Sequence, residues 1–231
     1  MKRATIGARL RACASLVRRG AVLADVGTDH AYLPIYLFDE GLIERAVLSD
    51  INEGPLAVAL QNINECGYRD RVSLSLSDGA ASLKDSGATD YAICGMGGEL
   101  IADIVDRAPH LKDRGIRLVL QPMSRAAHLR EYLFDSGFSI LREVYSTDEG
   151  KHYLTILAEY IGERVGFTEA EAYLGKEGCA ETSPALYEYM TGAYRSLMKI
   201  RDGKERGGSD ASYERALLAE IEKRYDIRRY L

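Results

Sequence analysis

The sequence AVLADVGTDH, residues 21–30, places a short apolar run directly before a cluster of small and polar residues. An apolar run of this length that ends at a glycine is typical of a buried strand followed by a turn. Three ionisable side chains lie around its end, namely Asp25, Asp29 and His30. This stretch therefore predicts a buried strand that brings charged groups to one point.

The same pattern recurs along the first two thirds of the chain. Short apolar runs occupy residues 21–27, 45–50, 71–76, 89–95 and 116–121. An amphipathic segment with helical spacing precedes them at 5–18, and further helical candidates separate them at 31–40, 54–65, 97–107 and 124–135. Strands that alternate with helices in this way predict an α/β fold with a parallel sheet covered by helices on both faces.

Two more apolar runs follow, at residues 138–146 and 152–161, with only a short charged connection between them. Such a short connection predicts an antiparallel hairpin at the edge of the sheet. The sequence as a whole then predicts a mostly parallel, seven-stranded, Rossmann-like sheet.

The composition changes after about residue 162, which predicts a Rossmann-like domain at 1–162 and a helical domain at 163–231. A helix is expected to begin near Ser183 and Pro184 and to end at the glycines 203, 207 and 208. Its apolar residues step by four and three, as in a coiled coil: Leu186, Met190, Ala193, Leu197 and Ile200. A second helix, marked by Tyr213, Leu217, Ile221 and Tyr225, is expected to pack antiparallel to it, each being about 30 Å long.

Composition limits the class of protein. The chain is 46% hydrophobic and 28% charged, as in ordinary globular proteins. It lacks both the roughly 18 consecutive apolar residues of a membrane span and the apolar core of a secretory signal, so we expect a cytoplasmic protein without membrane association. The four cysteines and four histidines are scattered, so neither a metal site nor a disulfide framework is expected. Nothing indicates a stable protein partner, and we expect a monomer.

The net charge of −5 hides a basic N-terminus. Six cations precede the first acidic residue, namely Lys2, Arg3, Arg9, Arg11, Arg18 and Arg19. They form either a solvated helix face or a patch that contacts the phosphates of a nucleic acid.

Unusual residues follow four of the predicted strands, at 25–30, 50–52, 78–79 and 95–98. Ligands of parallel sheets bind beyond the carboxyl ends of the strands, so these segments should line one pocket. A nicotinamide cofactor is disfavoured, because the fingerprint G-x-G-x-x-G is absent and an acidic loop repels a pyrophosphate. S-adenosylmethionine has no phosphate and carries a positively charged sulfonium and ammonium group. Nearby carboxylates attract these charges, so the acidic pocket favours binding of S-adenosylmethionine.

The sequence resembles the bacterial tRNA adenine-22 N1-methyltransferases, the TrmK family. The resemblance covers the chain from about residue 4 to its end and rests on DVGTDHAYLP (25–34), DINEGPL (50–56), SDG (77–79), CGMGGELI (94–101) and LQPM (120–123). Thr28 and Cys94 are mild departures from the serine and alanine expected there. It implies a class I methyltransferase that binds S-adenosyl-L-methionine and methylates N1 of an adenine in tRNA.

The resemblance also implies roles for residues at the strand ends. It places Asp25, Gly27, Asp29 and His30 on the methionine side, Asp50 on the ribose, Ile51 on the adenine, and Asp78 with Gly79 at the adenine edge. Asn52, Gly95 and Met96 complete the implied cofactor contacts.

Chemistry at N1 needs the target base to be unpaired or flipped. Gly95, Gly97 and Gly98 either let that base approach the methyl group or form only a tight turn. Asp29 either removes a proton from N6, holds the cationic product, or only binds the cofactor, and Tyr32 is a stacking or hydrogen-bonding candidate. In this interpretation the N-terminal arginines at 9, 11, 18 and 19 contact tRNA phosphates. The C-terminal helices either reach a second part of the tRNA with their basic residues or, since glutamates are nearly as numerous there, form an interaction arm or a dimer contact.

Three other functions stay open on the residues alone. The chain could methylate another RNA, a protein or a small molecule, or be a non-catalytic RNA-binding module with a Rossmann-like sheet. A dehydrogenase is the third. The acidic residues kept together at the strand ends argue against a non-catalytic module, and the missing glycines of the nicotinamide fingerprint argue against a dehydrogenase.

Overall fold

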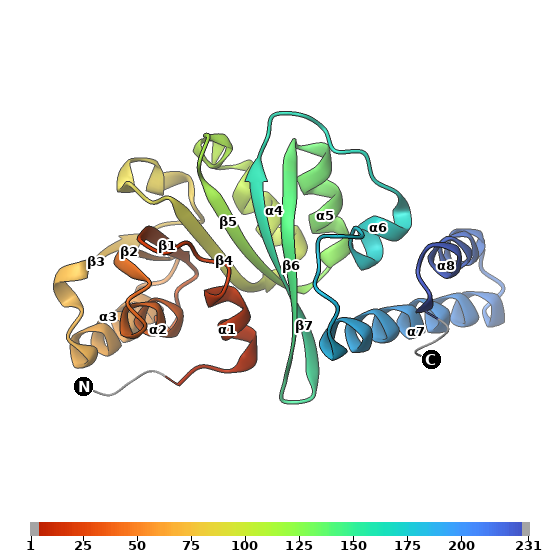
Figure 1. Ribbon diagram of the computed structural model, residues 1–231, viewed down its shortest axis with the longest axis horizontal. Helices are drawn as coiled ribbons and strands as arrows, with labels where there is room; N and C mark the ends of the chain where they lie inside the picture. Colours follow the sequence, from red (N-terminus) through yellow and green to blue (C-terminus); the bar gives the residue numbers. More distant parts are fainter. Residues whose placement is uncertain (1–4, 228–231) are drawn as a thin grey trace.

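The computed structural model describes residues 5–227, and its centre is a seven-stranded sheet (Figure 1). The strands are β1 (Ala21–Val26), β2 (Ile43–Asp50), β3 (Val72–Leu76), β4 (Asp90–Gly97), β5 (Arg117–Ser124), β6 (Phe138–Asp148) and β7 (Lys151–Tyr160). Their order is β3-β2-β1-β4-β5-β7-β6, with β1 to β5 parallel and β7 antiparallel to both of its neighbours. The predicted fold class, the five parallel strands and the edge hairpin are confirmed.

Helices cover both faces of this sheet, as the alternating pattern predicted. One face carries α1 (Ala8–Ala14), α2 (Tyr32–Asp39) and α3 (Glu53–Cys66), and the other carries α4 (Gly98–Asp106) and α5 (Ala126–Asp135). Each layer has its own apolar core, built on alternate residues of the strands because successive strand side chains point to opposite faces. Short 3₁₀ turns lie at Arg69–Arg71, Ala81–Ser86 and Pro109–Lys112.

The first helix is shorter than predicted. Its helical apolar spacing extends over residues 5–18, but α1 ends at Ala14. The N–H groups of Leu16 and Val17 then bond to carbonyls three residues back, which tightens the chain into turns while both side chains stay buried. The spacing thus identified the buried positions correctly and the end of the helix incorrectly, because the chain must turn there to enter β1.

The strand order reverses between β1 and β4. The chain runs from β1 outward to β2 and β3, then returns across the sheet to β4 and β5. The connections after β1 and β4 therefore lie on opposite faces, which opens a crevice between the carboxyl ends of these two strands.

Three helices follow the sheet: α6 (Glu169–Leu174), α7 (Pro184–Arg206) and α8 (Ser212–Arg224). Ser183 caps α7 as predicted, since its hydroxyl accepts a hydrogen bond from the N–H of Leu186 at 3.2 Å. Figure 1 shows α8 lying alongside α7, with both reaching away from the sheet. The apolar pattern did not predict α6, whose signal in the sequence is the capping box formed by Thr168 and Glu171.

The predicted coiled-coil seam is only partly present. Met190 and Leu197 are buried against α8. However, Ile200 of the predicted seam is 50% exposed, and Tyr194, which is not part of that seam, is buried. The 13 residues of α8 also make it about 20 Å long instead of the predicted 30 Å. The apolar face of α7 contacts β6 and β7 as well as α8, so it does not follow a strict coiled-coil register.

The C-terminal helices are packed continuously onto the sheet domain. Arg130 of α5 is fully buried and pairs with Glu143 of β6 at 2.6 Å. Its guanidinium also donates to the carbonyl oxygens of Ala172 and Tyr173 in α6, at 3.1 Å each. The domain boundary at residue 162 therefore stays a prediction. Within residues 5–227, no helix is both long and apolar enough to cross a membrane.

Candidate functional site

A cavity of about 460 Å³ opens at the carboxyl ends of β1, β2 and β4, where the strand order reverses. Its lining residues are Arg9, Leu10, Asp25, Gly27, Thr28, Asp29, His30, Tyr32, Leu33, Asp50, Cys94, Gly95 and Met96. The cavity brings together seven of the predicted cofactor residues, at 25, 27, 29, 30, 50, 95 and 96, along with Tyr32.

Asp25 forms the inner wall of the cavity at the end of β1. Its side chain is buried and accepts a hydrogen bond from the hydroxyl of Thr28 at 2.6 Å. Burial raises the pKa of Asp25 to about 6, while the hydrogen bond from Thr28 lowers it and the nearby charge of Asp50 adds to the increase. A cationic ligand would stabilise the ionised form of this carboxyl group.

The loop after β1 presents the next group of side chains at the cavity rim. Gly27 has φ +75°, and Asp29 and Ala31 are also in the left-handed region, at 47° and 58°. Such conformations in non-glycine residues are uncommon and gather at functional sites. They place His30 against the ring of Tyr32, stacked at 5.2 Å, and near the carboxylate of Asp29 at 3.5 Å. The side chain of Asp29 is 73% exposed and free to meet a ligand.

The loop after β2 contributes Asp50. Its carboxylate accepts a hydrogen bond from the N–H of Asn52 at 2.9 Å, so Asn52 fixes this carboxylate from outside the cavity lining. Ile51 does not line the cavity either and is 61% exposed.

Asp78 and Gly79, after β3, also lie outside the cavity lining. The Asp78 carboxylate pairs with Arg107 of α4 at 2.8 Å, which lowers the pKa of Asp78. A Cβ at Gly79 would contact Ile104 at 3.4 Å, so α4 packs closely against this turn. The structure does not bring these two residues to the rest of the site.

The glycine loop, residues 95–98, spans the end of β4 and the start of α4 and contains three glycines with different geometries. Gly95 lines the cavity with φ +79°. Gly98 begins α4, and a Cβ there would lie 2.4 Å from the carbonyl oxygen of Arg125, so its missing side chain lets α5's first turn come close. Gly97 has an ordinary φ of −66°, and its nearest neighbour would be the Ser124 hydroxyl at 3.4 Å. Neither Gly97 nor Gly98 lines the cavity.

Arg9 of α1 enters the cavity, which the sequence did not predict. Its guanidinium donates to the side-chain oxygen of Gln121 at 2.7 Å and lies over the ring of Tyr153. The interpretation of Arg9 as one of four phosphate-binding arginines overlooked this inward position, because no local spacing places α1 against β5. Leu10, Thr28, Leu33 and Cys94 also line the cavity and were not predicted.

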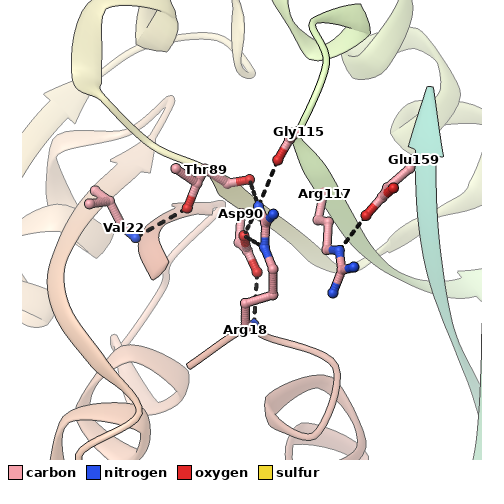
Figure 2. Close-up of polar contacts among 7 residues, drawn as sticks. All are labelled: Arg18, Val22, Thr89, Asp90, Gly115, Arg117 and Glu159. Carbon is pink, nitrogen blue, oxygen red and sulfur yellow. Dashed lines mark hydrogen bonds and ion pairs between the residues drawn. The ribbon is translucent and has the colours of Figure 1, made fainter. Parts of the chain in front are cut away.

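Arg18 lies at the amino end of β4, which is the opposite end of the strand from the cavity (Figure 2). Its guanidinium pairs with the fully buried Asp90 and donates to the carbonyl oxygens of Thr89 and Gly115, at 2.7 and 2.8 Å. Its backbone N–H also donates to Asp90, at 2.9 Å. The geometry gives Arg18 a structural role, because these bonds use its charge internally and far from the cavity.

The remaining predicted phosphate contacts are Arg11 and Arg19, which are both exposed. Arg11 follows Arg9 by two residues on α1, so its side chain points to a different side of the helix, where its guanidinium donates to the carbonyl oxygen of Ile6 at 2.5 Å. Arg19 lies next to Arg18, at the amino ends of the strands and remote from the cavity. Lys2, Arg3, Arg228 and Arg229 lie outside the described residues.

The chemistry of the cavity fits S-adenosylmethionine. Three carboxylates, those of Asp25, Asp29 and Asp50, suit its cationic groups and ribose hydroxyls. Arg9 supplies a cation for its carboxylate. Gly27 leaves room for the end of the Met96 side chain, which a Cβ at Gly27 would displace.

Comparisons with known proteins identify the family of this chain. A family model described as a methyltransferase domain matches residues 6–156. The tRNA (adenine(22)-N(1))-methyltransferase of Bacillus subtilis (strain 168) is 34% identical over 159 residues, which cover 69% of this chain and 67% of that protein.

Solved structures extend the similarity to the C-terminal helices. The Bacillus subtilis m1A22 tRNA methyltransferase TrmK has a TM-score of 0.77 and 29% identity, with 98% of each chain covered. The Streptococcus pneumoniae protein Sp1610, solved with S-adenosyl-L-methionine, has a TM-score of 0.80 and 30% identity over 94% of this chain and 99% of that one. The chain therefore belongs to the methyltransferase-domain family and, within it, to the tRNA (adenine(22)-N(1))-methyltransferases.

Proposed function

We propose that this protein transfers the methyl group of S-adenosyl-L-methionine to N1 of adenine 22 in tRNA. The observation that carries the proposal is the carboxylate-lined cavity at the switch point of the sheet, in a chain that matches TrmK over its full length. The family relationship supplies the substrate and the position, and the cavity supplies the residues that bind the methyl donor.

The residues of the cavity divide the binding work between them. Asp50 accepts hydrogen bonds from the ribose hydroxyls, and the N–H of Asn52 holds its carboxylate in place. Asp25 lies at the end of β1, where its negative charge favours the cationic methionine portion. The bound cofactor supplies an electrophilic methyl carbon.

Asp29 acts on the acceptor base. N1 of adenine attacks in line, which leaves a positive charge on the ring, and the exposed carboxylate of Asp29 either stabilises this charge or accepts the N6 proton. The ring of Tyr32, which is 48% exposed, offers a stacking surface for the flipped base. Arg11, which is exposed on α1, contacts tRNA phosphates.

A cytoplasmic monomer without a stable protein partner is part of the same proposal. It rests on the composition of the chain.

The test is transfer of labelled methyl groups to unmodified tRNA transcripts that carry A22 or G22, followed by nucleoside mass spectrometry. We expect 1-methyladenosine with the A22 transcript and no transfer to the G22 transcript. Transfer to both transcripts would refute the assigned position. Binding of S-adenosylmethionine without transfer to either transcript would refute tRNA as the acceptor.

A further inference from the structure

Arg9 is a cation in a cavity whose other charged groups are mostly carboxylates. Among residues 5–227, its guanidinium forms no ion pair, and its polar partner is the neutral amide of Gln121. A guanidinium beside a neutral acceptor keeps its full charge for a ligand. The cavity therefore presents negative charge at Asp25 and Asp50 and positive charge at Arg9, which matches a ligand that carries charges of both signs.

Gln121 is the residue that holds Arg9 in this position. Its side chain is fully buried at the carboxyl end of β5, and its oxygen accepts from Arg9 at 2.7 Å and from the N–H of Gly95 at 3.1 Å. Its amide nitrogen donates to the carbonyl oxygen of Pro122 at 3.0 Å. Across these three bonds the amide oxygen accepts and the amide nitrogen donates. Flipping the amide would break them, so the side chain has one orientation.

We propose that Gln121 is a positioning residue that aims the Arg9 guanidinium at the carboxylate of the cofactor's methionine portion. The same amide oxygen ties Gly95, in the glycine loop, to Arg9 of α1, so one buried group sets two walls of the cavity. This inference rests on the proposed use of S-adenosylmethionine.

The neutrality of residue 121 is essential to this role. A glutamate has almost the same shape and keeps the acceptor for Arg9 and Gly95, but its charge would pair with Arg9 inside the protein. The cofactor carboxylate would then meet a neutralised guanidinium, and the loss would fall on ligands that carry this carboxylate.

The experiment compares Gln121→Glu with the unsubstituted protein by calorimetric binding of two ligands. S-adenosylhomocysteine has the carboxylate, and 5′-methylthioadenosine lacks the amino-acid portion. We expect the variant to bind S-adenosylhomocysteine at least about tenfold more weakly, because a charge-assisted hydrogen bond is lost, and 5′-methylthioadenosine almost unchanged. Gln61→Glu is the matched control, since Gln61 is exposed on α3 and should alter neither affinity.

Equal weakening for both ligands would overturn the proposal, because it would indicate a general change in the cavity. Unchanged binding of both would overturn it as well. If Gln121→Glu does not fold, Gln121→Met gives the comparison, since it removes the acceptor that holds the Arg9 guanidinium and should lose affinity mainly for S-adenosylhomocysteine. These binding results do not depend on methyl transfer, so failure of the tRNA assignment leaves them interpretable.

Discussion

At the scale of single residues, the strand ends were the most predictable part of the site. Asp25, Asp29 and Asp50 stand out because a buried strand rarely ends in carboxylates without a reason, and all three line the cavity. Arg9 was predicted as a phosphate contact and Gln121 was given no role; their place at the cavity was not predictable, because it comes from a contact over 112 positions of sequence. Local pattern carries no information about such a contact.

Asp29 is the residue for which turnover and binding should separate. Its carboxylate is exposed at the rim, so Asp29→Ala should lower kcat at least about 100-fold while S-adenosylhomocysteine affinity falls much less. Asp50→Ala is the comparison, and it should mainly weaken cofactor binding. Single-turnover kinetics and calorimetry measure the two effects, and an equal loss of both for Asp29→Ala would leave it a binding residue only.

Asp25 should make cofactor binding depend on pH. Burial raises the pKa of Asp25 from 3.8 to about 6, so its negative charge is largely lost at pH 5 and present at pH 7. Affinity for S-adenosylmethionine should therefore rise up to about tenfold between pH 5 and pH 7. Asp25→Asn should flatten this rise, and a rise that persists in the variant would assign the effect to another group.

The same pKa shift has the opposite effect on the stability of the unliganded protein. Below pH 3.8, Asp25 is protonated in both the folded and the unfolded state. The raised pKa means that the folded state holds this proton to a higher pH, so the stability contributed by Asp25 is lost as the pH rises towards about 6. The ligand and the fold therefore favour different protonation states of one carboxyl group.

Substitution of Gly97 tests whether the glycine loop lets the target base approach or forms only a tight turn. Gly95 needs its positive φ and Gly98 its missing Cβ, but Gly97 has neither constraint. Gly97→Ala should leave thermal stability and S-adenosylhomocysteine binding nearly unchanged and lower kcat/KM for tRNA at least about tenfold, if the base approaches there. Gly95→Ala should instead cost about 1–2 kcal/mol of folding free energy. Full activity of Gly97→Ala would reduce the loop to a turn.

At the scale of elements, sequence periodicity identified the strands and helices but not their partners. Arg18 shows the difference, because a basic residue on a predicted amphipathic helix suggested a phosphate contact. It instead joins the turn after α1 to the starts of β4 and β5, as Figure 2 shows. The buried partner, Asp90, is recognisable only once the sheet order is known.

This contact predicts a difference between two adjacent arginines. Arg18→Ala leaves the buried carboxylate of Asp90 without its cation, so it should lower the free energy of unfolding by about 2–3 kcal/mol. The same change at the exposed Arg19 should cost less than about 0.5 kcal/mol. Urea unfolding of both variants measures this. Equal stabilities would show that the Arg18–Asp90 pair contributes little.

At the scale of the whole molecule, the sequence separated two domains that the structure packs together. Apolar residues after position 162, including Val165 and Phe167, complete the core beneath α4 and α5, and α6 satisfies the buried Arg130. A truncation at 162 would therefore expose the core of the sheet domain. It cannot isolate a tRNA-binding role of the C-terminal helices.

Charge reversal on the surface of α7 and α8 is the sharper test of that role. Several of their cations are used in internal ion pairs, such as Lys204 with Glu214 and Arg224 with Glu171. The exposed Lys199 and Lys223 are in none of the ion pairs that the described residues form, which leaves their charge available to phosphates.

If these helices bind tRNA, Lys199→Glu with Lys223→Glu should weaken tRNA binding and reduce the slope of log affinity against log salt by about 1–2, since each lost phosphate contact removes about 0.7–0.9. Cofactor affinity should not change. Lys84→Glu with Lys112→Glu makes the same change in net charge in the 3₁₀ turns that precede β4 and β5, and should leave both the affinity for tRNA and the salt slope nearly unchanged. An equal loss in both double variants would mean that net charge, and not these helices, sets the affinity for tRNA.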